Sequence, residues 1–338
     1  MRNAQREPKQ NLQPTHQVIV NGQSLGERMR HLKEALQFYL PGTNVFNTAV
    51  GGTGYTGLRI GTNPFNRSVI AGGDVVVIVH GEYESYINTS AATFAGYMQT
   101  WRDDYAAALR KSNLKMLFCQ CSSQAYFAFG DYSMSKVALG QFNTAFDGTH
   151  TGLYMMGPKY YFPYMSDKTH LTDDGCSWLG QKYAQILSRL INTGSWAPLY
   201  PTSITRSGAD VTIHLNVPVG PLVFDTTTLA AHPEGKYGFR YEDSDGAMGI
   251  ATTPVISGNT ITFSLPGTPT AVTRKVRYGY WKTAASTPIY NGDPYTNSYA
   301  AGGMLYGNVR DSDSVSRYVD GNAYQMGNWL VQFEMDVP

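Results

Sequence analysis

The sequence predicts an α/β domain with a mainly parallel sheet, followed by an all-β domain, and three observations support this prediction. Between residues 17 and 192, short apolar segments alternate with segments in which apolar residues recur at helical spacing. The segment "VVVIV" at residues 75–79 is a continuous β-branched run, which is typical of a parallel strand buried on both faces. After about residue 196 the helical spacing disappears, and short alternating segments such as "DVTIHLNVP" take over.

These patterns divide the chain into three regions. Residues 1–16 are polar and are expected to form a flexible lead-in, and residues 17–195 are expected to form a three-layer α/β domain. Residues 196–338 are expected to form an antiparallel, sandwich-like accessory domain, because turn sequences such as Ser257-Gly258-Asn259 separate its short strands.

Five strands and four helices are expected in the α/β domain. The strands are predicted at residues 18–20, 44–50, 75–79, 114–121 and 151–158. The helices are predicted at residues 25–40, 91–111, 133–146 and 173–192. Pro41-Gly42 ends the first helix, and Asp173 or Asp174 is the expected cap of the last.

The composition argues against several partners and cofactors. The 26 Lys and Arg residues nearly balance the 25 Asp and Glu residues, so bulk charge would not hold a nucleic acid. The apolar run at residues 75–79 is too short to span a membrane. No zinc-binding spacing is present, the three cysteines are expected to be buried thiols, and we expect neither a metal nor an organic cofactor. The N-terminal segment lacks the apolar core of a secretory signal peptide.

Polar residues follow the predicted strands at the positions where an open α/β sheet forms its sites. The first three strands are followed by Gly22-Gln23-Ser24, by Gly51-Gly52-Thr53-Gly54 and by His80-Gly81-Glu82. The segment "SDKTHLTDDG", residues 166–175, precedes the last helix. Because the carboxyl ends of parallel strands meet at one edge, these four segments are expected to lie together.

The residue types in these segments suit nucleophilic catalysis. A serine hydroxyl attacks an ester efficiently only when a base takes its proton, and His170 is the candidate base for Ser24. Asp167, three residues before this histidine, is the candidate for orienting its imidazole ring. The backbone N–H groups of Ser24 and Gly52 are candidate donors to the oxyanion of a tetrahedral intermediate.

The same segments resemble the sequence blocks of the SGNH hydrolases, the GDSL-like esterases. "NGQSLGE" resembles the first block in the branch of sialate O-acetylesterases and acetylxylan esterases, which implies that Ser24 is the nucleophile. "NTAVGGTG" resembles the second block and implies Gly52, or else Gly51, as the oxyanion glycine. "DKTHLTDDG" resembles the fifth block and implies that Asp167 and His170 complete the triad. The resemblance covers about residues 17–192 and implies a flavodoxin-like fold.

The third block departs from the family pattern. His80 stands where the acetylesterase branch usually has glutamine, and its imidazole is a candidate third oxyanion donor or a structural histidine. Glu82 matches the glutamate of the family and is expected to brace the loops. Gln23, Glu82 and Tyr161 are candidate substrate contacts, although the aromatic run around Tyr161 would also serve to pack its loop.

Other interpretations of these residues remain open in the sequence. Ser24 is also suited to cap a helix that starts at Leu25. His150, in a polar loop, is an alternative base. The segment "RDSD" at residues 310–313 is interpreted as a charged turn or as a loop between domains.

The resemblance implies a serine esterase that removes O-acetyl groups from a carbohydrate, such as a bacterial surface polysaccharide. The C-terminal region is similar to modules on phage-encoded and secreted relatives, so an extracellular or virion-associated tail-spike deacetylase is expected, trimeric if it is part of a tail spike. Two alternatives are an inactive glycan-binding or structural module and an esterase for small acyl esters.

Overall fold

The computed structural model describes residues 16–121, 136–165, 169–232, 235–246, 249–279, 306–319 and 321–338. Its N-terminal half contains one parallel sheet in the order β2-β1-β3-β4-β5. These strands are β1 (His16–Gly22), β2 (Thr43–Asn47), β3 (Val75–Val79), β4 (Lys115–Gln120) and β5 (Leu153–Pro158). The prediction of a mainly parallel α/β domain is therefore confirmed. The predicted lead-in lies outside the described residues, except for His16, which begins β1.

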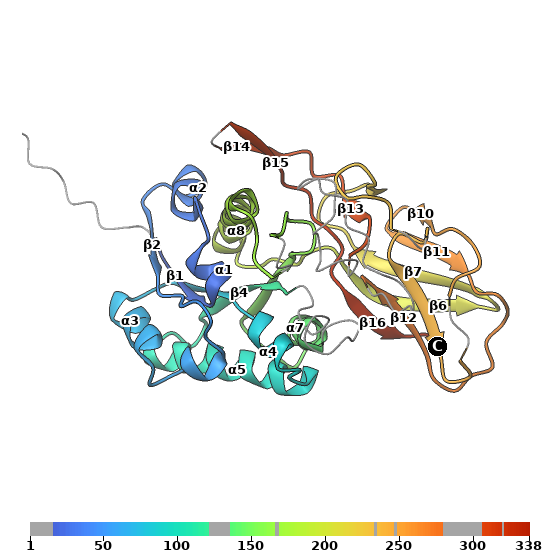
Figure 1. Ribbon diagram of the computed structural model, residues 1–338, viewed down its shortest axis with the longest axis horizontal. Helices are drawn as coiled ribbons and strands as arrows, with labels where there is room; N and C mark the ends of the chain where they lie inside the picture. Colours follow the sequence, from blue (N-terminus) through green and yellow to red (C-terminus); the bar gives the residue numbers. More distant parts are fainter. Residues whose placement is uncertain are drawn as a thin grey trace, which may run out of the picture.

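Helices cover both faces of this sheet and make it the middle layer of three (Figure 1). One face carries α2 (Leu32–Tyr39) and α8 (Asp173–Thr193). The other carries α3 (Asn63–Ala71), α5 (Ala91–Ala108) and α7 (Lys136–Phe146). All five residues of β3 are buried, as the β-branched run predicted for a strand covered on both sides.

The predicted helix at residues 25–40 is instead two helices, α1 (Ser24–Glu27) and α2. His31, which precedes α2, has a left-handed backbone with φ of 57°. The segment between the helices packs closely on α8, because a Cβ atom at Gly180 would lie 1.9 Å from the carbonyl oxygen of Arg30. Tertiary packing therefore interrupts a segment whose apolar spacing alone predicted one continuous helix.

The C-terminal half consists of antiparallel sheets, as predicted from the loss of helical spacing after about residue 196. The first has the order β10-β11-β7-β6, from β6 (Tyr200–Ser207), β7 (Asp210–Asn216), β10 (Val255–Ser257) and β11 (Thr260–Ser264). The second has the order β16-β12-β9, from β9 (Phe239–Asp243), β12 (Arg274–Tyr278) and β16 (Phe333–Asp336). The Phe239 and Phe263 rings meet between the two sheets, with centroids 6.0 Å apart. Two further pairs are β8 (Leu222–Phe224) with β13 (Val309–Asp311) and β14 (Ser316–Val319) with β15 (Asn322–Gln325).

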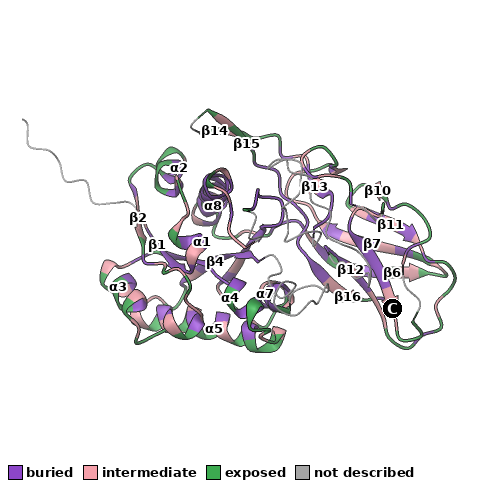
Figure 2. Cartoon of the chain, in the orientation of Figure 1, coloured by how far each residue is buried: buried purple, intermediate pink, exposed green. Residues whose placement is uncertain are grey.

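The last part of the chain returns to the α/β half. The β14–β15 hairpin extends beside α2 and α8 (Figure 1), and the Trp178 indole N–H of α8 donates to the carbonyl oxygen of Gln325 at 2.8 Å. The side chain of Gln120, at the end of β4, makes hydrogen bonds of 2.7 Å to both the carbonyl oxygen and the N–H of Gln332. Buried residues therefore run without interruption from the parallel sheet into the β-structure (Figure 2). Among the residues described, no helix has the length and apolarity that crossing a membrane requires.

Candidate active site

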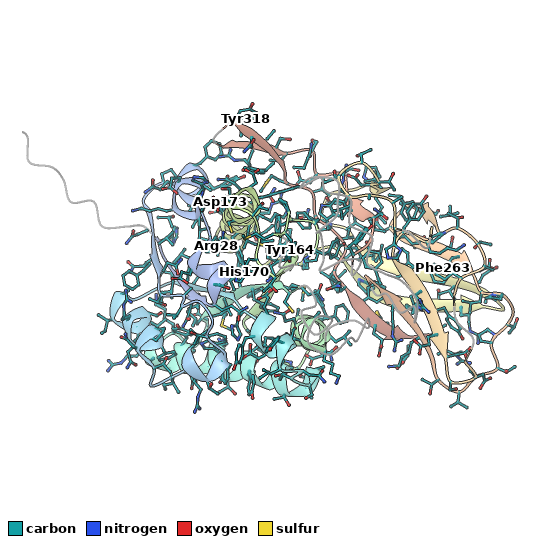
Figure 3. The ribbon with its side chains drawn as sticks, in the orientation of Figure 1. Arg28, Tyr164, His170, Asp173, Phe263 and Tyr318 are labelled. Atoms are coloured by element: carbon teal, nitrogen blue, oxygen red, sulfur yellow. The ribbon has the colours of Figure 1, made fainter. Side chains whose placement is uncertain are left out.

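Ser24 and His170 meet at the carboxyl edge of the parallel sheet, although 146 residues separate them in the sequence. Ser24 is the first residue of α1, directly after β1, and its Oγ lies 2.9 Å from Nε2 of His170. Figure 3 shows the imidazole beside α1, near Arg28. At this distance the imidazole is placed to accept the hydroxyl proton as the serine attacks.

The loop that carries His170 is held by backbone hydrogen bonds. The N–H of Met165 donates to the carbonyl oxygen of His170 at 2.7 Å, and the N–H of Thr172 donates to Pro163 at 3.0 Å. Thr172, rather than Asp173 or Asp174, caps α8 by accepting the N–H of Gly175. The predicted orienting residue Asp167 lies in residues 166–168, outside the described residues, so its role stays a prediction.

The turn that presents Ser24 requires a glycine. Gly22 has a φ of +138°, and a Cβ atom there would lie 2.2 Å from the carbonyl oxygen of Val79. The same carbonyl oxygen accepts the N–H of Gln23 at 3.0 Å. β1 and β3 therefore approach each other closely enough to fix the backbone immediately before Ser24.

The structure distinguishes the two glycines that were candidates for the oxyanion loop. The N–H of Gly51 donates to the Glu27 carboxylate at 2.9 Å, so it is already engaged. Gly52, with φ of +66°, lines the pocket beside Ser24. Within the described part of the chain, neither the Gly52 N–H nor the Ser24 N–H donates to a protein acceptor. Both groups are thus available to an oxyanion in this pocket.

A pocket of about 340 Å³ opens over the Ser24–His170 pair. Its walls combine the predicted polar residues with aromatic rings that the sequence analysis missed. Its lining residues are Gln23, Ser24, Gly52, Glu82, Tyr83, Tyr86, Thr169 and His170. Tyr83 and Tyr86 belong to the short helix α4 (Glu82–Tyr86) and are 41% and 51% exposed. The sequence contained one signal that could have identified these two tyrosines: they are three residues apart and directly follow the third block.

Gln23 and Glu82 join the turn that carries Ser24 to the start of α4. The Gln23 side-chain amide donates to a Glu82 carboxylate oxygen at 2.7 Å, and its carbonyl oxygen accepts the N–H of Tyr83 at 3.3 Å. The other carboxylate oxygen is paired with Lys159, a buried lysine that the sequence analysis did not consider. Burial lowers the pKa of the Lys159 ammonium group, but the Glu82 carboxylate outweighs it and the pKa lies above its usual value.

His80 does not reach the pocket. It is buried, its Nε2 lies 2.5 Å from a carboxylate oxygen of Glu84, and its ring packs edge-on against Trp101. Burial raises the pKa of the Glu84 carboxyl group, but the contact with His80 outweighs burial and the pKa is lowered. The other Glu84 oxygen accepts the N–H of Tyr55 at 2.6 Å. This geometry favours the structural interpretation of His80 over oxyanion donation.

Other predicted residues also lie away from the pocket. Tyr161 is buried and stacks on Trp329 with ring centroids 5.5 Å apart, so it packs its loop down instead of lining the cleft. The imidazole of His150 pairs with Asp147 at 2.9 Å, and this pair is not among the residues that line the pocket. All three cysteines are buried and free, and burial raises the pKa of the Cys121 thiol to about 12. The described residues contain no cluster of three or more potential metal ligands.

Comparisons with known proteins agree with this architecture. No family model matches the sequence, and no curated protein matches it. Among solved structures, a carbohydrate acetylesterase from Xanthomonas citri aligns with a TM-score of 0.63 at 12% identity, covering 95% of this chain and 80% of the other.

Two further alignments have TM-scores below 0.5, so they carry no argument of their own. A member of the lipolytic G-D-S-L family from Veillonella parvula aligns with a TM-score of 0.39 at 11% identity, over 52% of this chain and 99% of the other. A tail fibre protein of an E. coli phage aligns with a TM-score of 0.36 at 11% identity, over 78% of this chain and 34% of the other. Together with the parallel sheet and the placement of its loops, the alignment with the Xanthomonas citri protein shows that the chain has the fold of the SGNH/GDSL-like hydrolases.

Proposed function

We propose that this protein is a serine esterase that removes O-acetyl groups from a carbohydrate. The observation that carries the proposal is the 2.9 Å contact between Ser24 Oγ and His170 Nε2 at the base of an open pocket. A buried serine–histidine contact would be compatible with a purely structural role. This contact instead faces a space of about 340 Å³ with two backbone N–H donors beside it.

In the first half of the reaction, Ser24 Oγ attacks the acetyl carbonyl carbon while His170 Nε2 takes the hydroxyl proton. The carbonyl oxygen becomes an oxyanion that accepts hydrogen bonds from the N–H groups of Ser24 and Gly52. When the C–O bond to the sugar breaks, His170 returns the proton to the leaving alkoxide. An acetyl group then remains on the serine.

In the second half, water attacks the acetyl-enzyme while His170 accepts one of its protons. The collapse of the second tetrahedral intermediate breaks the bond to Ser24 Oγ, and the proton on His170 passes to this oxygen. Acetate leaves and the site is restored. Asp167 is the candidate residue for stabilising the imidazolium that forms in both halves.

Two features support a carbohydrate as the alcohol part of the ester. The half-exposed rings of Tyr83 and Tyr86 offer flat apolar surfaces with hydroxyl groups, which suit the mixed polar and apolar faces of a sugar ring. An alignment with a TM-score of 0.63, over 95% of this chain and 80% of the other, is to a carbohydrate acetylesterase. A bacterial surface polysaccharide is the substrate class that we propose, with acetate release as its measurable product.

The test compares the native chain with Ser24→Ala and with a matched control, Ser112→Ala. The control removes an exposed serine hydroxyl in the turn before β4, and Ser112 is not among the residues that line the pocket. Acetate release is measured with p-nitrophenyl acetate and with a panel of O-acetylated polysaccharides. We expect loss of release in Ser24→Ala by about 10⁴-fold or more and native rates in the control.

The possible results separate the hypotheses. Activity that survives in folded Ser24→Ala would contradict the serine mechanism. An inactive native chain that binds the acetylated glycans would instead favour the glycan-binding module. Activity on p-nitrophenyl acetate without activity on any glycan would favour an esterase for small acyl esters.

A further inference from the structure

The pocket wall beside the nucleophile contains a buried carboxylate with no role in the steps above. Glu82 is almost fully buried and lines the same pocket as Ser24, Gly52 and His170. A negative oxyanion develops in this pocket during both halves of the proposed reaction. An uncompensated carboxylate in the wall would oppose that charge, and it would do so more strongly because the surroundings are shielded from water.

Lys159 supplies the compensating charge from a distant part of the fold. It follows β5 directly, whereas Glu82 follows β3, and β4 lies between these two strands in the sheet. The lysine side chain must therefore pass the end of β4 to pair with the Glu82 carboxylate. It is 0% exposed, and it is the only Asp, Glu, Lys or Arg between residues 148 and 166.

A second consequence of the pair concerns the turn of the nucleophile. The carboxylate oxygen that does not face Lys159 accepts the Gln23 amide at 2.7 Å. The Gln23 carbonyl oxygen is consequently directed at the N–H of Tyr83. Gln23 immediately precedes Ser24, so the ion pair fixes both the charge of the pocket wall and the side chain next to the oxyanion donor.

We propose that Lys159 is a positioning residue of the esterase site: through Glu82 it neutralises the pocket wall and fixes Gln23, so that the oxyanion forms beside a charge-balanced pair. This inference rests on the proposed esterase function. Burying a charge is unfavourable without a compensating partner, so an apolar side chain would be the simpler choice at this strand end. The proposed role explains why a lysine stands there instead.

Other titratable groups surround the pair and belong in the test. Cys119 and Cys121 of the β4 end face both members, Tyr164 faces Lys159, and Tyr183 of α8 faces Glu82. Burial raises the pKa values of both thiols and of the Tyr183 hydroxyl, so these groups are neutral near pH 7. His170 lines the same pocket.

The experiment measures kcat for p-nitrophenyl acetate from about pH 6 to about pH 9 in the native chain, Lys159→Met, Lys159→Arg and the double variant Lys159→Met/Glu82→Gln. The profile of the native chain is the reference for the three variants. In Lys159→Met the negative charge of the Glu82 carboxylate has no compensating partner and opposes the oxyanion, so kcat is expected to fall by about 30-fold relative to the native chain toward the alkaline end.

The double variant removes both charges and keeps an amide beside Gln23. We expect it to regain the native shape of the pH profile, and we expect Lys159→Arg, which keeps the positive charge, to retain that shape. A purely structural lysine would give a different result: the double variant would then be no better than Lys159→Met. Thermal unfolding of each variant separates loss of folded protein from loss of kcat.

A native pH profile in Lys159→Met would overturn the proposal, as would a double variant that keeps the alkaline loss. If Lys159→Met does not fold, the profiles of the double variant and of Lys159→Arg decide the question. An inactive native chain would contradict the esterase function itself, whereas an active native chain with unaltered variants would contradict only the role of Lys159.

Discussion

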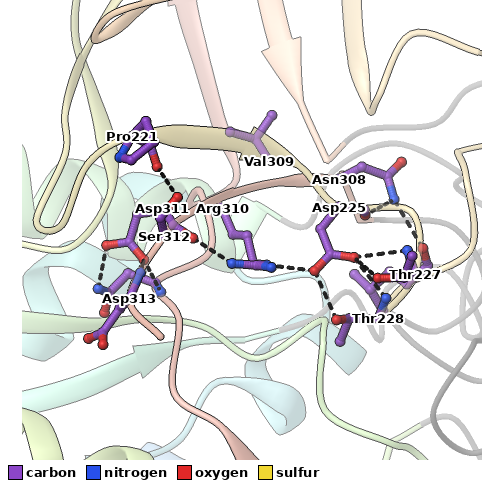
Figure 4. A network of polar contacts seen from close by, with 12 residues as sticks. Pro221, Asp225, Thr227, Thr228, Asn308, Val309, Arg310, Asp311, Ser312 and Asp313 are labelled. Carbon is purple, nitrogen blue, oxygen red and sulfur yellow. Dashed lines mark hydrogen bonds and ion pairs between the residues drawn. The ribbon is translucent and has the colours of Figure 1, made fainter. Parts of the chain in front are cut away.

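Two buried polar networks in this protein look alike in composition and differ in what surrounds them. The first joins Gln23, Glu82 and Lys159 beneath the pocket. The second lies in the C-terminal half, where Arg310 donates to the Asp225 carboxylate at 2.5 Å (Figure 4). In the same network, Asp311 contacts Asn328. Each network contains carboxylates that are almost entirely shielded from solvent.

The second network is closed by its own hydrogen bonds. One carboxylate oxygen of Asp311 accepts the N–H groups of Asp313 and Asn328, and the other accepts the N–H of Val219 and the side-chain amide of Asn328. Asp313 in turn accepts the Arg189 guanidinium of α8 at 3.0 Å. Arg310 and Asp311 belong to β13 and not to a loop. The contact between Asp313 and α8 nevertheless agrees with the interpretation of residues 310–313 as a contact with the other part of the chain.

The difference between the networks shows that buried charge alone does not identify a site. Both networks satisfy their polar atoms, but of the two only the first adjoins the Ser24–His170 contact and an open pocket. Substitutions in the first are expected to change the rate of hydrolysis. Substitutions in the second are expected to change the free energy of unfolding.

The largest effect is expected from His170→Ala. Without the imidazole, Ser24 has no base within hydrogen-bond distance in the described structure, so kcat for p-nitrophenyl acetate should fall by about 10⁴-fold with little change in stability. His150→Ala is the matched control, because His150, like His170, stands three residues after an aspartate in the sequence but lies outside the pocket lining. A comparable loss of kcat in His150→Ala would favour His150 as the base and would contradict the assignment of catalysis to the pocket.

A smaller effect, on stability, is expected from Asp311→Ala. The substitution leaves the N–H groups of Val219, Asp313 and Asn328 without their acceptor in a buried region, so the free energy of unfolding should fall by about 3 kcal/mol. Urea unfolding measures this loss, and kcat of the folded variant should stay near the native value. A large fall in kcat with unchanged stability would show that the second network serves the active site.

The general position of the candidate site could be predicted from the sequence, because the segments that follow parallel strands lie together at the carboxyl edge of the sheet. Ser24 and His170 are 146 residues apart, but each lies in a segment that adjoins the carboxyl edge of the sheet. The alternation of strands and helices was therefore enough to bring them together. The φ of +66° at Gly52 likewise agrees with a glycine-rich turn after the second strand.

The contacts of individual side chains did not follow from such patterns. His80 follows β3 as expected, but it turns away from the pocket because Glu84, four residues later, offers it a carboxylate. Lys159 pairs with Glu82 across an intervening strand and 77 residues, a distance at which no local spacing is informative. The break between α1 and α2 depends in the same way on the close approach of Gly180 to Arg30.

The smallest expected effect that separates the networks is a pH dependence of the free energy of unfolding that arises from the Asp225 carboxyl group. Burial raises the pKa of this carboxyl group, but hydrogen bonds from Arg310, Thr227 and Thr228 outweigh burial and lower the pKa to about 2. Because the pKa in the folded state lies below that of the unfolded chain, the stabilisation is complete above about pH 4 and disappears as the pH falls through about 2.

Asp225→Asn should therefore lower the free energy of unfolding by about 2 kcal/mol near neutral pH, and the difference from the native chain should shrink in acid. Urea unfolding at about pH 6 and about pH 3 measures both values. The substitution should leave kcat unaltered, since Asp225 is bonded to Arg310 and not to the pocket. A stability difference that stays constant over this pH range would mean that the carboxylate charge contributes nothing there. The closed network would then depend on hydrogen-bond geometry alone, whereas the network beneath the pocket is expected to depend on charge.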